Sequence, residues 1–590
     1  MAKKESVRRG PAGREATVVW LRQDLRLSDH PALAWAVERG GPIIPVYIWS
    51  PEEEGPWAPG AVARAALAVI LEGLERELLA RGSRLVLRRG PAGEALLDLA
   101  REARAGAVCW SRRYEPAARA QEARVERILG SEGVEARGFP GTLLVEPQEL
   151  RTRAGGPYKV FTPFYRELLA RHDPEPPLAC PRRVAPPGRW PRGLAIEELG
   201  PVAAGVPPLP GAGSLDLTEP SAQRRLRGFL ERRVAAYAEE RDRLDLEGTS
   251  RLSAALHFGL ISPHQVWAAA RSGRTERAAR SARPQRSERA ARSARPARSE
   301  RLARSARPGR SAQFAAPEGS AARGSAGGTA RERGARTAGA RIGMAGRGDA
   351  LSGIDAFLRQ LCWREFAHHL LHHFPHTPEE PLRPEFAAFP WIADPRRERA
   401  WREGRTGYPV VDAAMAELRS TGWMHNRARL IVASFLVKDL LIPWQVGARW
   451  FWETLADADL ADNTLGWQWT AGCGADAAPF FRIFNPSLQG RRFDPRGDYV
   501  RRFVPELAAI PAAHIHAPWE APAGVLAAAR VRLGRDYPRP IVDHGEARER
   551  ALEALEAVDA GAGRQREAPE APGRTPDAGR GLRRSRRRRP

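Results

Sequence analysis

The chain has 590 residues, 17 tryptophans and a formal net charge of +24. This length predicts two domains with enough material to enclose a large cofactor. The charge is concentrated outside the predicted folded core: residues 271–349 hold 20 arginines and 6 acidic residues, 563–590 hold 10 and 3, and 1–16 hold 5 basic and 2 acidic residues. The net charge is therefore no evidence that the core binds nucleic acid.

The four cysteines are scattered and form no CxxC pair; they are Cys109, Cys180, Cys362 and Cys473. Such spacing excludes a disulfide framework and indicates reduced thiols in a cytoplasmic protein. No apolar stretch follows Arg8-Arg9, so an export signal is not expected. A membrane-spanning helix is also excluded, because no run of about eighteen apolar residues is free of charges.

Residues 17–140 alternate short apolar runs with helical stretches. The runs lie at 18–21, 42–49, 84–88 and 107–110, and the helical patterns at 61–80 and 92–104. This alternation is typical of an α/β domain with a doubly wound parallel sheet, as in Rossmann-like folds. Ligands of such sheets bind at the carboxyl ends of the strands, where the RQDLRLSD loop and residues 49–57 are expected.

Residues 141–215 are rich in Pro, Gly and Ala and predict an interdomain connector. In 216–270 and 350–545, apolar residues recur at spacings of three and four, which predicts an all-helical domain. The string HHLLHH at 368–373 lacks an acidic partner, so we expect an exposed helix face and no metal site.

The segment 271–349 interrupts the helical pattern. Arginine recurs at every third position from Arg271 to Arg310, within a twelve-residue repeat that has prolines at 284, 296 and 308. It holds too few large apolar residues to form a core and is expected to be disordered, as are 1–16 and 563–590. Two readings stay open for the insertion and for the tail: a tolerated expansion, or an arm that binds phosphates.

The region 404–494 carries the most informative motifs: GRTGYPVVDAAM, TGWMHNRARLIVASFLVKDLLIPW, DADLADNTLGWQW and DAAPFFRIFNP. In these strings tryptophans alternate with polar residues of a kind that needs partners when buried. We therefore expect a polar, flat, aromatic ligand among them.

Together with GTSRLSAALHFGLISPHQVW at 248–267 and FLRQLCWREF at 357–366, these motifs closely resemble the DNA photolyase/cryptochrome family. The resemblance is strongest to class I enzymes that repair cyclobutane pyrimidine dimers, and it runs from about Thr17 to His544 outside the insertion. It implies a monomer that uses FAD and acts on single- or double-stranded DNA with ultraviolet-induced dimers. Members of the family can also hold a second, antenna chromophore of folate or deazaflavin type, whose identity this sequence does not give. In the implied reaction, excited and fully reduced FAD passes an electron to the dimer, the ring opens, and the electron returns.

By the same resemblance, Asn463 faces flavin N5, and an Arg429–Asp457 ion pair stabilises a negatively charged ring. Hydroxyls and backbone N–H groups of 249–253 suit the FAD pyrophosphate, although an ordinary helix cap has the same residues. The implied FAD-binding residues are Tyr237, Thr249, Ser250, Arg251, Leu252, Ser253, Phe357, Arg364, Arg429, Asp457, Ala458, Asp459 and Asn463.

Three tryptophans match the family's electron-transfer chain: Trp391, Trp444 and Trp467. Trp363 and Trp469 resemble the pair that stacks on a flipped-out dimer. The other implied DNA-binding residues are Arg241, Gln360, Asn426, Arg427, Leu430 and Gln489.

Gln360 and Leu430 stand where many family members have Glu and Met, so repair is either retained with altered efficiency or lost. One alternative is a cryptochrome-like light receptor without repair activity. Another is a structural DNA-binding protein that acts through its arginine-rich segments.

Overall fold

A computed structural model describes residues 15–171, 175–199, 216–272, 352–477, 480 and 482–567. The chain divides into two units, one formed by 1–271 with 352–590 and the other by 272–351. The arginine-rich insertion, apart from its first residues, lies outside the described residues. So do the last 23 positions of the predicted basic tail, 568–590, and residues 1–14.

In the described N-terminal region, five parallel strands form one sheet in the order β3-β2-β1-β4-β5. The strands are β1 Ala16–Leu21, β2 Ile43–Trp49, β3 Val86–Arg89, β4 Ala105–Ser111 and β5 Glu135–Phe139. The predicted doubly wound α/β domain is confirmed. The apolar runs did not reveal β5, because its sequence EARGF carries charges and forms an edge of the sheet.

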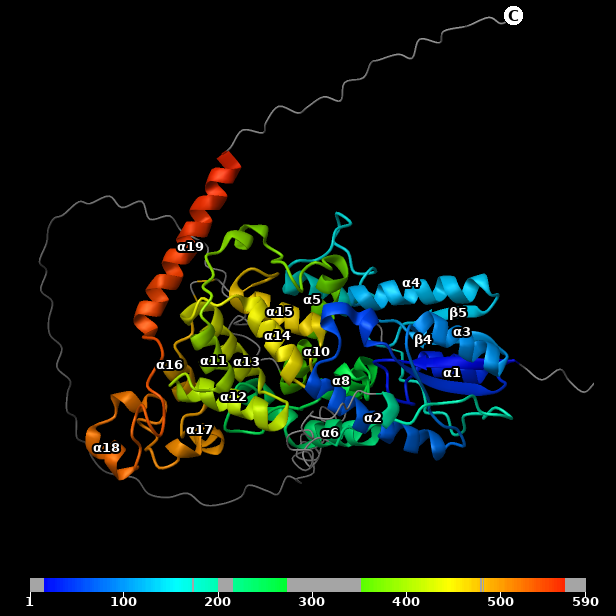
Figure 1. Cartoon of the computed structure of the whole chain (residues 1–590), viewed down its shortest axis with the longest axis horizontal. Coiled ribbons are helices and arrows are strands. Elements are labelled where there is room, and N and C mark those ends of the chain that lie inside the picture. Colours follow the sequence, from blue (N-terminus) through cyan, green and yellow to red (C-terminus); the bar gives the residue numbers. More distant parts are fainter. Residues whose placement is uncertain are drawn as a thin grey trace, which may run out of the picture. The chain divides into compact units, whose positions relative to one another are not determined.

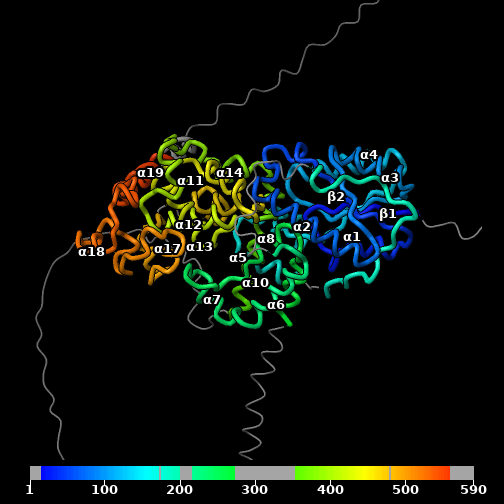
Figure 2. The backbone as a smooth tube through the Cα atoms, turned by 60° about the horizontal axis from the view of Figure 1, so that its bottom comes forward, coloured from blue at the N-terminus to red at the C-terminus, as the bar shows by residue number. Residues whose placement is uncertain are grey.

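Helices cover both faces of this sheet (Figure 2). Side chains of a strand alternate between its faces, and β1 follows that rule. Val19 and Leu21 pack with α1 and α2, whereas Val18 and Trp20 pack with α3 and α4. The bounds are α1 Pro31–Arg39, α2 Ala61–Leu79, α3 Ala92–Ala103 and α4 Pro116–Ser131, with a short 3-10 segment η1 Pro51–Trp57 after β2.

The rest of this unit is helical in its described part, as predicted, and α11 to α18 lie to the left of the sheet in Figure 1. The helices are α5 Phe161–Arg171, α6 Glu219–Arg232, α7 Tyr237–Glu240, α8 Ser253–His257, a helical run at 263–272, α10 Gly353–His373, α11 Pro395–Glu403, α12 Pro409–Thr421, α13 Asn426–Ser434, α14 Trp444–Thr454, α15 Leu460–Ala471, α16 Pro486–Phe493, α17 Asp498–Phe503, α18 Ala523–Ala528 and α19 His544–Glu567. A π-helical turn, η5 Phe435–Asp439, extends α13.

Local signals fix the ends of the helices that carry the motifs. The side chain of Asp459 caps α15 by accepting a hydrogen bond from the backbone N–H of Asp462. The same helix ends at Gly472, whose φ of 83° is the left-handed conformation that glycine adopts without strain. At the start of α13, Nδ1 of His425 accepts a hydrogen bond from the backbone N–H of Arg427. These caps fix the residues at which α13 and α15 begin and α15 ends, and so determine which polar residues of each motif lie on a helix.

The segment expected to be a connector also contains helix α5. Its side chains Phe161 and Phe164 are fully buried and contact Phe366 of α10. The Pro- and Gly-rich composition of 141–215 concealed this helix because only about eleven of its residues are helical.

The histidines of α10 correct another expectation. His368 and His369 are buried instead of lying on an exposed helix face. Nε2 of His369 accepts a hydrogen bond from the backbone N–H of Tyr158 at 3.0 Å, and its Nδ1 lies 3.2 Å from the carbonyl oxygen of Pro147. The segment around α5 covers this face of α10, which periodicity alone could not reveal.

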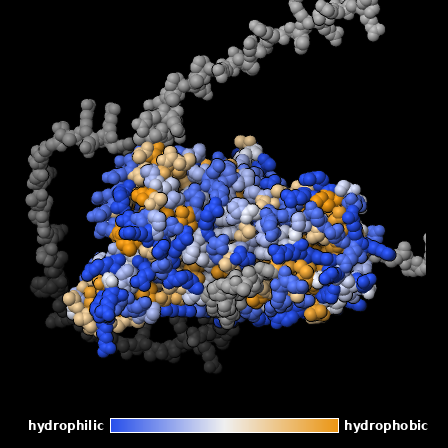
Figure 3. Space-filling view, viewed as in Figure 1, coloured by the Kyte–Doolittle hydropathy of each residue, from blue (hydrophilic) through white to orange (hydrophobic). Residues whose placement is uncertain are grey.

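None of the helices in the described ranges combines the length and apolar character needed to cross a membrane. On the face shown in Figure 3, hydrophilic residues predominate and apolar residues are scattered in small groups. The apolar residues are instead gathered in interior clusters on the two sides of the sheet and among the helices.

Candidate functional site

A cavity lies where the carboxyl ends of β1 and β2 meet the helical region. Its volume is about 60 Å³, which holds only a few water molecules. The indole Nε1 of Trp452 in α14 donates a hydrogen bond to the carbonyl of Ala58 at 2.7 Å and so ties the two regions together. The walls include Trp20, Tyr47 and Trp49 from the strands, and His257, Phe258, Trp452 and Ala458 from the helical region.

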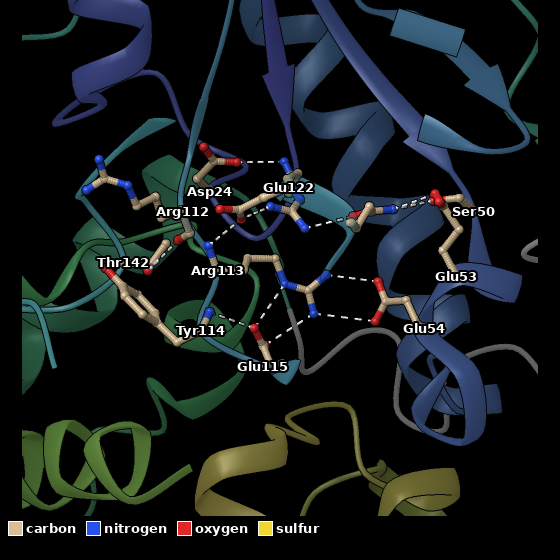
Figure 4. A network of polar contacts seen from close by, with 12 residues as sticks. Asp24, Ser50, Glu53, Glu54, Arg112, Arg113, Tyr114, Glu115, Glu122 and Thr142 are labelled. Carbon is tan, nitrogen blue, oxygen red and sulfur yellow. Dashed lines mark hydrogen bonds and ion pairs between the residues drawn. The ribbon is translucent and has the colours of Figure 1, made fainter. Parts of the chain in front are cut away.

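Paired charges line one side of this cavity (Figure 4). The guanidinium of Arg113 donates to Glu54 at 2.8 Å and to Glu115 at 3.2 Å. Arg22 donates to Gln121 at 2.8 Å and pairs with Glu122. Burial alone lowers the pKa of Arg113, but the two carboxylates raise it well above its usual value. The polar wall is therefore held in place by charge pairs before any ligand enters.

The predicted ion pair between Arg429 of α13 and Asp457 is present. Nη2 of Arg429 lies 2.9 and 2.7 Å from the two carboxylate oxygens, and its Nε donates to the carbonyl of Met424 at 2.9 Å. The Asp457 side chain is 1% exposed and that of Arg429 is 24% exposed. The accessible member of the pair is thus the cation.

Asp459 lies two residues further and has two histidine neighbours. Its Oδ2 is 3.8 Å from Nδ1 of His257 in α8 and 3.5 Å from Nε2 of His368 in α10. Burial alone raises the pKa of Asp459, but His368 and His257 hold it well below its usual range. This carboxylate joins three helices, because it also caps α15.

Asp462 and Asn463 are neighbours in α15, and both side chains are at least partly accessible. Asp462 is exposed, yet burial among the surrounding groups raises its pKa to about 7. Asn463 is half-buried, and its Nδ2 donates to the carbonyl of Ala448 at 3.0 Å.

Residues 249–253 lead into the short helix α8. Arg251 has a φ of 51°, and its guanidinium lies 4.4 Å from the ring centroid of Trp423. The exposed hydroxyl of Ser253 accepts a hydrogen bond from Nε1 of Trp423 at 3.2 Å. Thr249 and Ser250 are half-buried and Leu252 is buried. The hydroxyls expected to hold a pyrophosphate are therefore accessible, but most of them precede the helix.

Three more predicted residues pack around α7. Tyr237 contacts Phe357 of α10 edge to face at 5.7 Å, and the guanidinium of Arg241 lies 5.7 Å from the Tyr237 ring. Arg364, also in α10, donates to the carbonyl of Thr142 at 3.0 Å.

The three tryptophans of the predicted electron-transfer chain lie at different depths. Trp467 and Trp444 are buried, and Trp391 is half-buried. Among the described residues, the rings in contact with Trp467 belong to Phe451 at 5.0 Å and Trp401 at 6.3 Å, and no ring contact joins two of the three. Gly447 is required here, because a Cβ at this position would lie 2.0 Å from the Trp467 ring.

The predicted DNA-binding residues are accessible to different extents. Trp363 is half-buried, and one face of its ring stacks on Phe161 at 3.7 Å with an interplanar angle of 6°. Arg427 donates to Asp242 at 2.6 Å, so its charge is already paired. Asn426 is exposed, and the remaining half-buried members are Gln360, Leu430, Trp469 and Gln489.

Sequence reasoning missed several residues of these sites. It did not single out Asp462, although the repeated acids of DADLAD were a visible signal. It also missed Arg113 and its partners, which carry no motif: Glu54 lies 59 positions away and Glu115 two positions away.

Residues 17–182 match the family described as DNA photolyase, and residues 357–557 match the FAD binding domain of DNA photolyase. A deoxyribodipyrimidine photo-lyase of Agrobacterium fabrum is 40% identical over 547 residues, which cover 92% of this chain and 98% of that relative. The chain belongs to the DNA photolyase/cryptochrome family.

Both photolyases and cryptochromes are similar to this chain. Cryptochrome-1 of Arabidopsis thaliana is 34% identical, with 91% of this chain and 70% of that protein covered. The solved structure of a bacterial class III photolyase from Agrobacterium tumefaciens has a TM-score of 0.78 and 39% identity, covering 94% of this chain and all of that one. These likenesses confirm the family resemblance, but the class I likeness expected from the sequence gains no support from them.

As a member of this family the protein binds FAD, and its described residues fit that cofactor. The accessible hydroxyl of Ser253, the Arg429–Asp457 pair and the accessible side chains of Asp462 and Asn463 offer hydrogen-bonding groups and charge. A flavin with its pyrophosphate needs such groups along its length.

Proposed function

We propose that this protein uses blue or near-ultraviolet light to split cyclobutane pyrimidine dimers in DNA. The observation that carries the proposal is that accessible aromatic and amide side chains, Trp363, Trp469 and Gln360, occur within the FAD-binding domain. Aromatic faces recover part of the cost of unstacking a base, and that cost is lower for a damaged base.

Each group has a role in this proposal. Bound FAD supplies the light-driven electron when it is fully reduced. The Arg429–Asp457 pair stabilises the negative charge of the flavin ring. Trp391, Trp444 and Trp467 pass electrons that restore its reduced state. Trp363 and Trp469 enclose the dimer. Because Phe161 already covers one face of Trp363, only the other face is left for the lesion.

The Gln360 amide keeps a hydrogen-bond donor for a thymine carbonyl, and Leu430 keeps apolar volume. Dark binding tests this part of the proposal. We expect tighter binding to a DNA strand that contains one thymine dimer than to the same strand without damage. Equal affinities would contradict it.

A light receptor without repair activity is the second candidate. The 34% identity to Cryptochrome-1 of Arabidopsis thaliana favours it, as does the replacement of Glu by Gln at position 360. A receptor would show flavin photochemistry without preference for damaged DNA.

We also infer that the cavity at the strand ends is the site of an antenna pigment. Its walls combine the aromatic rings of Tyr47 and Trp49 with the charged side chains of Arg22 and Arg113, which suits a flat pigment with polar groups. Absorption that remains in the purified protein after FAD is subtracted would reveal the pigment. Absence of any second chromophore after reconstitution with both pigments would contradict the inference.

A further inference from the structure

Two of the three acids in DADLAD have cationic or histidine neighbours. Asp457 pairs with Arg429, and Asp459 lies between His257 and His368. The side chain of Asp462 forms no ion pair and no hydrogen bond with any of the described residues. Its backbone N–H donates a hydrogen bond to the carboxylate of Asp459. The carboxylate of Asp462 therefore has two negatively charged neighbours, Asp457 and Asp459, and no cation is paired with it among the described residues.

The nearby cations are already engaged. Arg429 of α13 is held by Asp457, and Arg364 of α10 donates to the carbonyl of Thr142 and lies 3.5 Å from Glu365. Burial, followed by the charges of Asp459 and Asp457, raises the pKa of Asp462 to about 7, against the opposing effects of Arg364 and Arg429. The carboxyl group of Asp462 therefore binds a proton more readily than an ordinary aspartate does.

The side chain of Asp462 is nevertheless exposed, and it precedes Asn463 in the same helical turn. It lies in the part of the chain that binds FAD, among the groups that fit the flavin. We propose that Asp462 lines the flavin cavity and takes up a proton when the bound FAD is reduced. The proposal rests on FAD binding and is independent of dimer repair.

The proton and electron balance is simple. Bound FAD accepts two electrons from an external reductant such as dithionite, and the ring takes one proton. The added negative charge makes the Asp462 carboxylate less favourable, so one of its oxygens takes a second proton from solvent. No bond to carbon forms or breaks, and reoxidation returns this proton to solvent.

Proton release and uptake can be counted on the FAD-loaded full-length protein. A pH indicator in weakly buffered solution follows proton uptake during anaerobic reduction between pH 7 and 9. The test variant is Asp462→Asn, which keeps the shape of the side chain without its titration. Asp98→Asn in α3 is the matched control, because it removes an exposed carboxylate far from the helical domain. Asp462→Glu restores a carboxyl group.

We expect wild type and Asp98→Asn to take up more protons per FAD than Asp462→Asn, by up to about one, with Asp462→Glu close to wild type. The reduced-minus-oxidised infrared spectrum should also gain a carbonyl band of a protonated carboxyl group, and Asp462→Asn should lack it. Equal proton uptake in wild type and Asp462→Asn, or a band that persists in Asp462→Asn, would overturn the proposal. If Asp462→Asn does not retain FAD, the infrared spectrum of Asp462→Glu replaces this comparison. Its protonated-carboxyl band should then be shifted relative to wild type, and an unshifted band would also overturn the proposal.

Discussion

The guanidinium of Arg429 contacts both carboxylate oxygens of Asp457, at 2.9 and 2.7 Å, and so fastens α13 to the residues just before α15. The carboxylate is almost fully buried, whereas the arginine remains partly accessible. A buried acid with one cationic partner cannot lose that partner without cost, because the charge is left without solvent or counter-ion.

We therefore expect Arg429→Ala to lower the free energy of unfolding by about 3 kcal/mol and to release FAD. The matched control is Arg449→Ala in α14, which breaks an ion pair with Glu379 in which both side chains are about half exposed. That change should cost less than about 1 kcal/mol and leave FAD bound. Denaturant unfolding and the FAD content after gel filtration measure both effects. Equal losses in the two variants would show that the Arg429–Asp457 pair has no special role.

Glu365 of α10 should make stability depend on pH. It is 3% exposed, its Oε2 accepts a hydrogen bond from the backbone N–H of Leu144 at 2.7 Å, and burial raises its pKa to about 7. The folded state thus binds this proton more tightly than the unfolded state, so the free energy of unfolding falls as pH rises from about 4.5 to about 7.

The variant Glu365→Gln removes this titration. Between pH 4 and pH 8 we expect it to lose less stability than wild type, by up to about 3 kcal/mol. Glu94→Gln, at an exposed position in α3, should follow the wild-type curve. Parallel curves for wild type and Glu365→Gln would mean that Glu365 stays ionised in the folded protein.

Trp469 is expected to recognise damaged DNA by stacking. The change Trp469→Ala should weaken binding to dimer-containing DNA in the dark by about 1–3 kcal/mol and leave the affinity for undamaged DNA unchanged. Trp190→Ala, which removes a half-buried tryptophan near Arg84 of the α/β domain, is the control. Fluorescence anisotropy measures both affinities. An equal loss for the two DNAs would contradict a stacking role.

Deletion of residues 275–345 should weaken DNA binding without affecting FAD binding. We expect FAD binding to persist, because the motifs that fit FAD lie outside this segment, while affinity for any DNA falls and its dependence on salt becomes shallower. The slope of log affinity against log salt concentration measures this effect. Loss of FAD on deletion would show instead that the segment supports the fold.

The fold was largely predictable because its signals are local. Apolar runs separated by helical stretches predicted the α/β sheet, and spacings of three and four predicted the helical domain. The edge strand β5 and helix α5 were missed, since charged or Pro-rich sequence conceals elements that depend on contacts with distant residues. The buried histidines of α10 were misjudged for the same reason.

The candidate site was predictable where a motif carried it. The Arg429–Asp457 pair followed from two motifs, although 28 positions separate the residues. In contrast, the pKa of Asp462 depends on its surroundings: burial and the carboxylates of Asp459 and Asp457 raise it, whereas Arg364 and Arg429, which have other partners, lower it. The sequence shows three acids but does not show which of them lacks a cation.

Light-driven repair can be followed by absorbance. The FAD-loaded protein, photoreduced without oxygen, is illuminated with DNA that contains thymine cyclobutane dimers while the absorbance near 260 nm is followed. Restored thymine bases absorb there, so we predict a light-dependent rise that is absent in the dark and in Trp469→Ala at low DNA concentration. No rise despite normal flavin reduction would contradict repair and favour a light receptor.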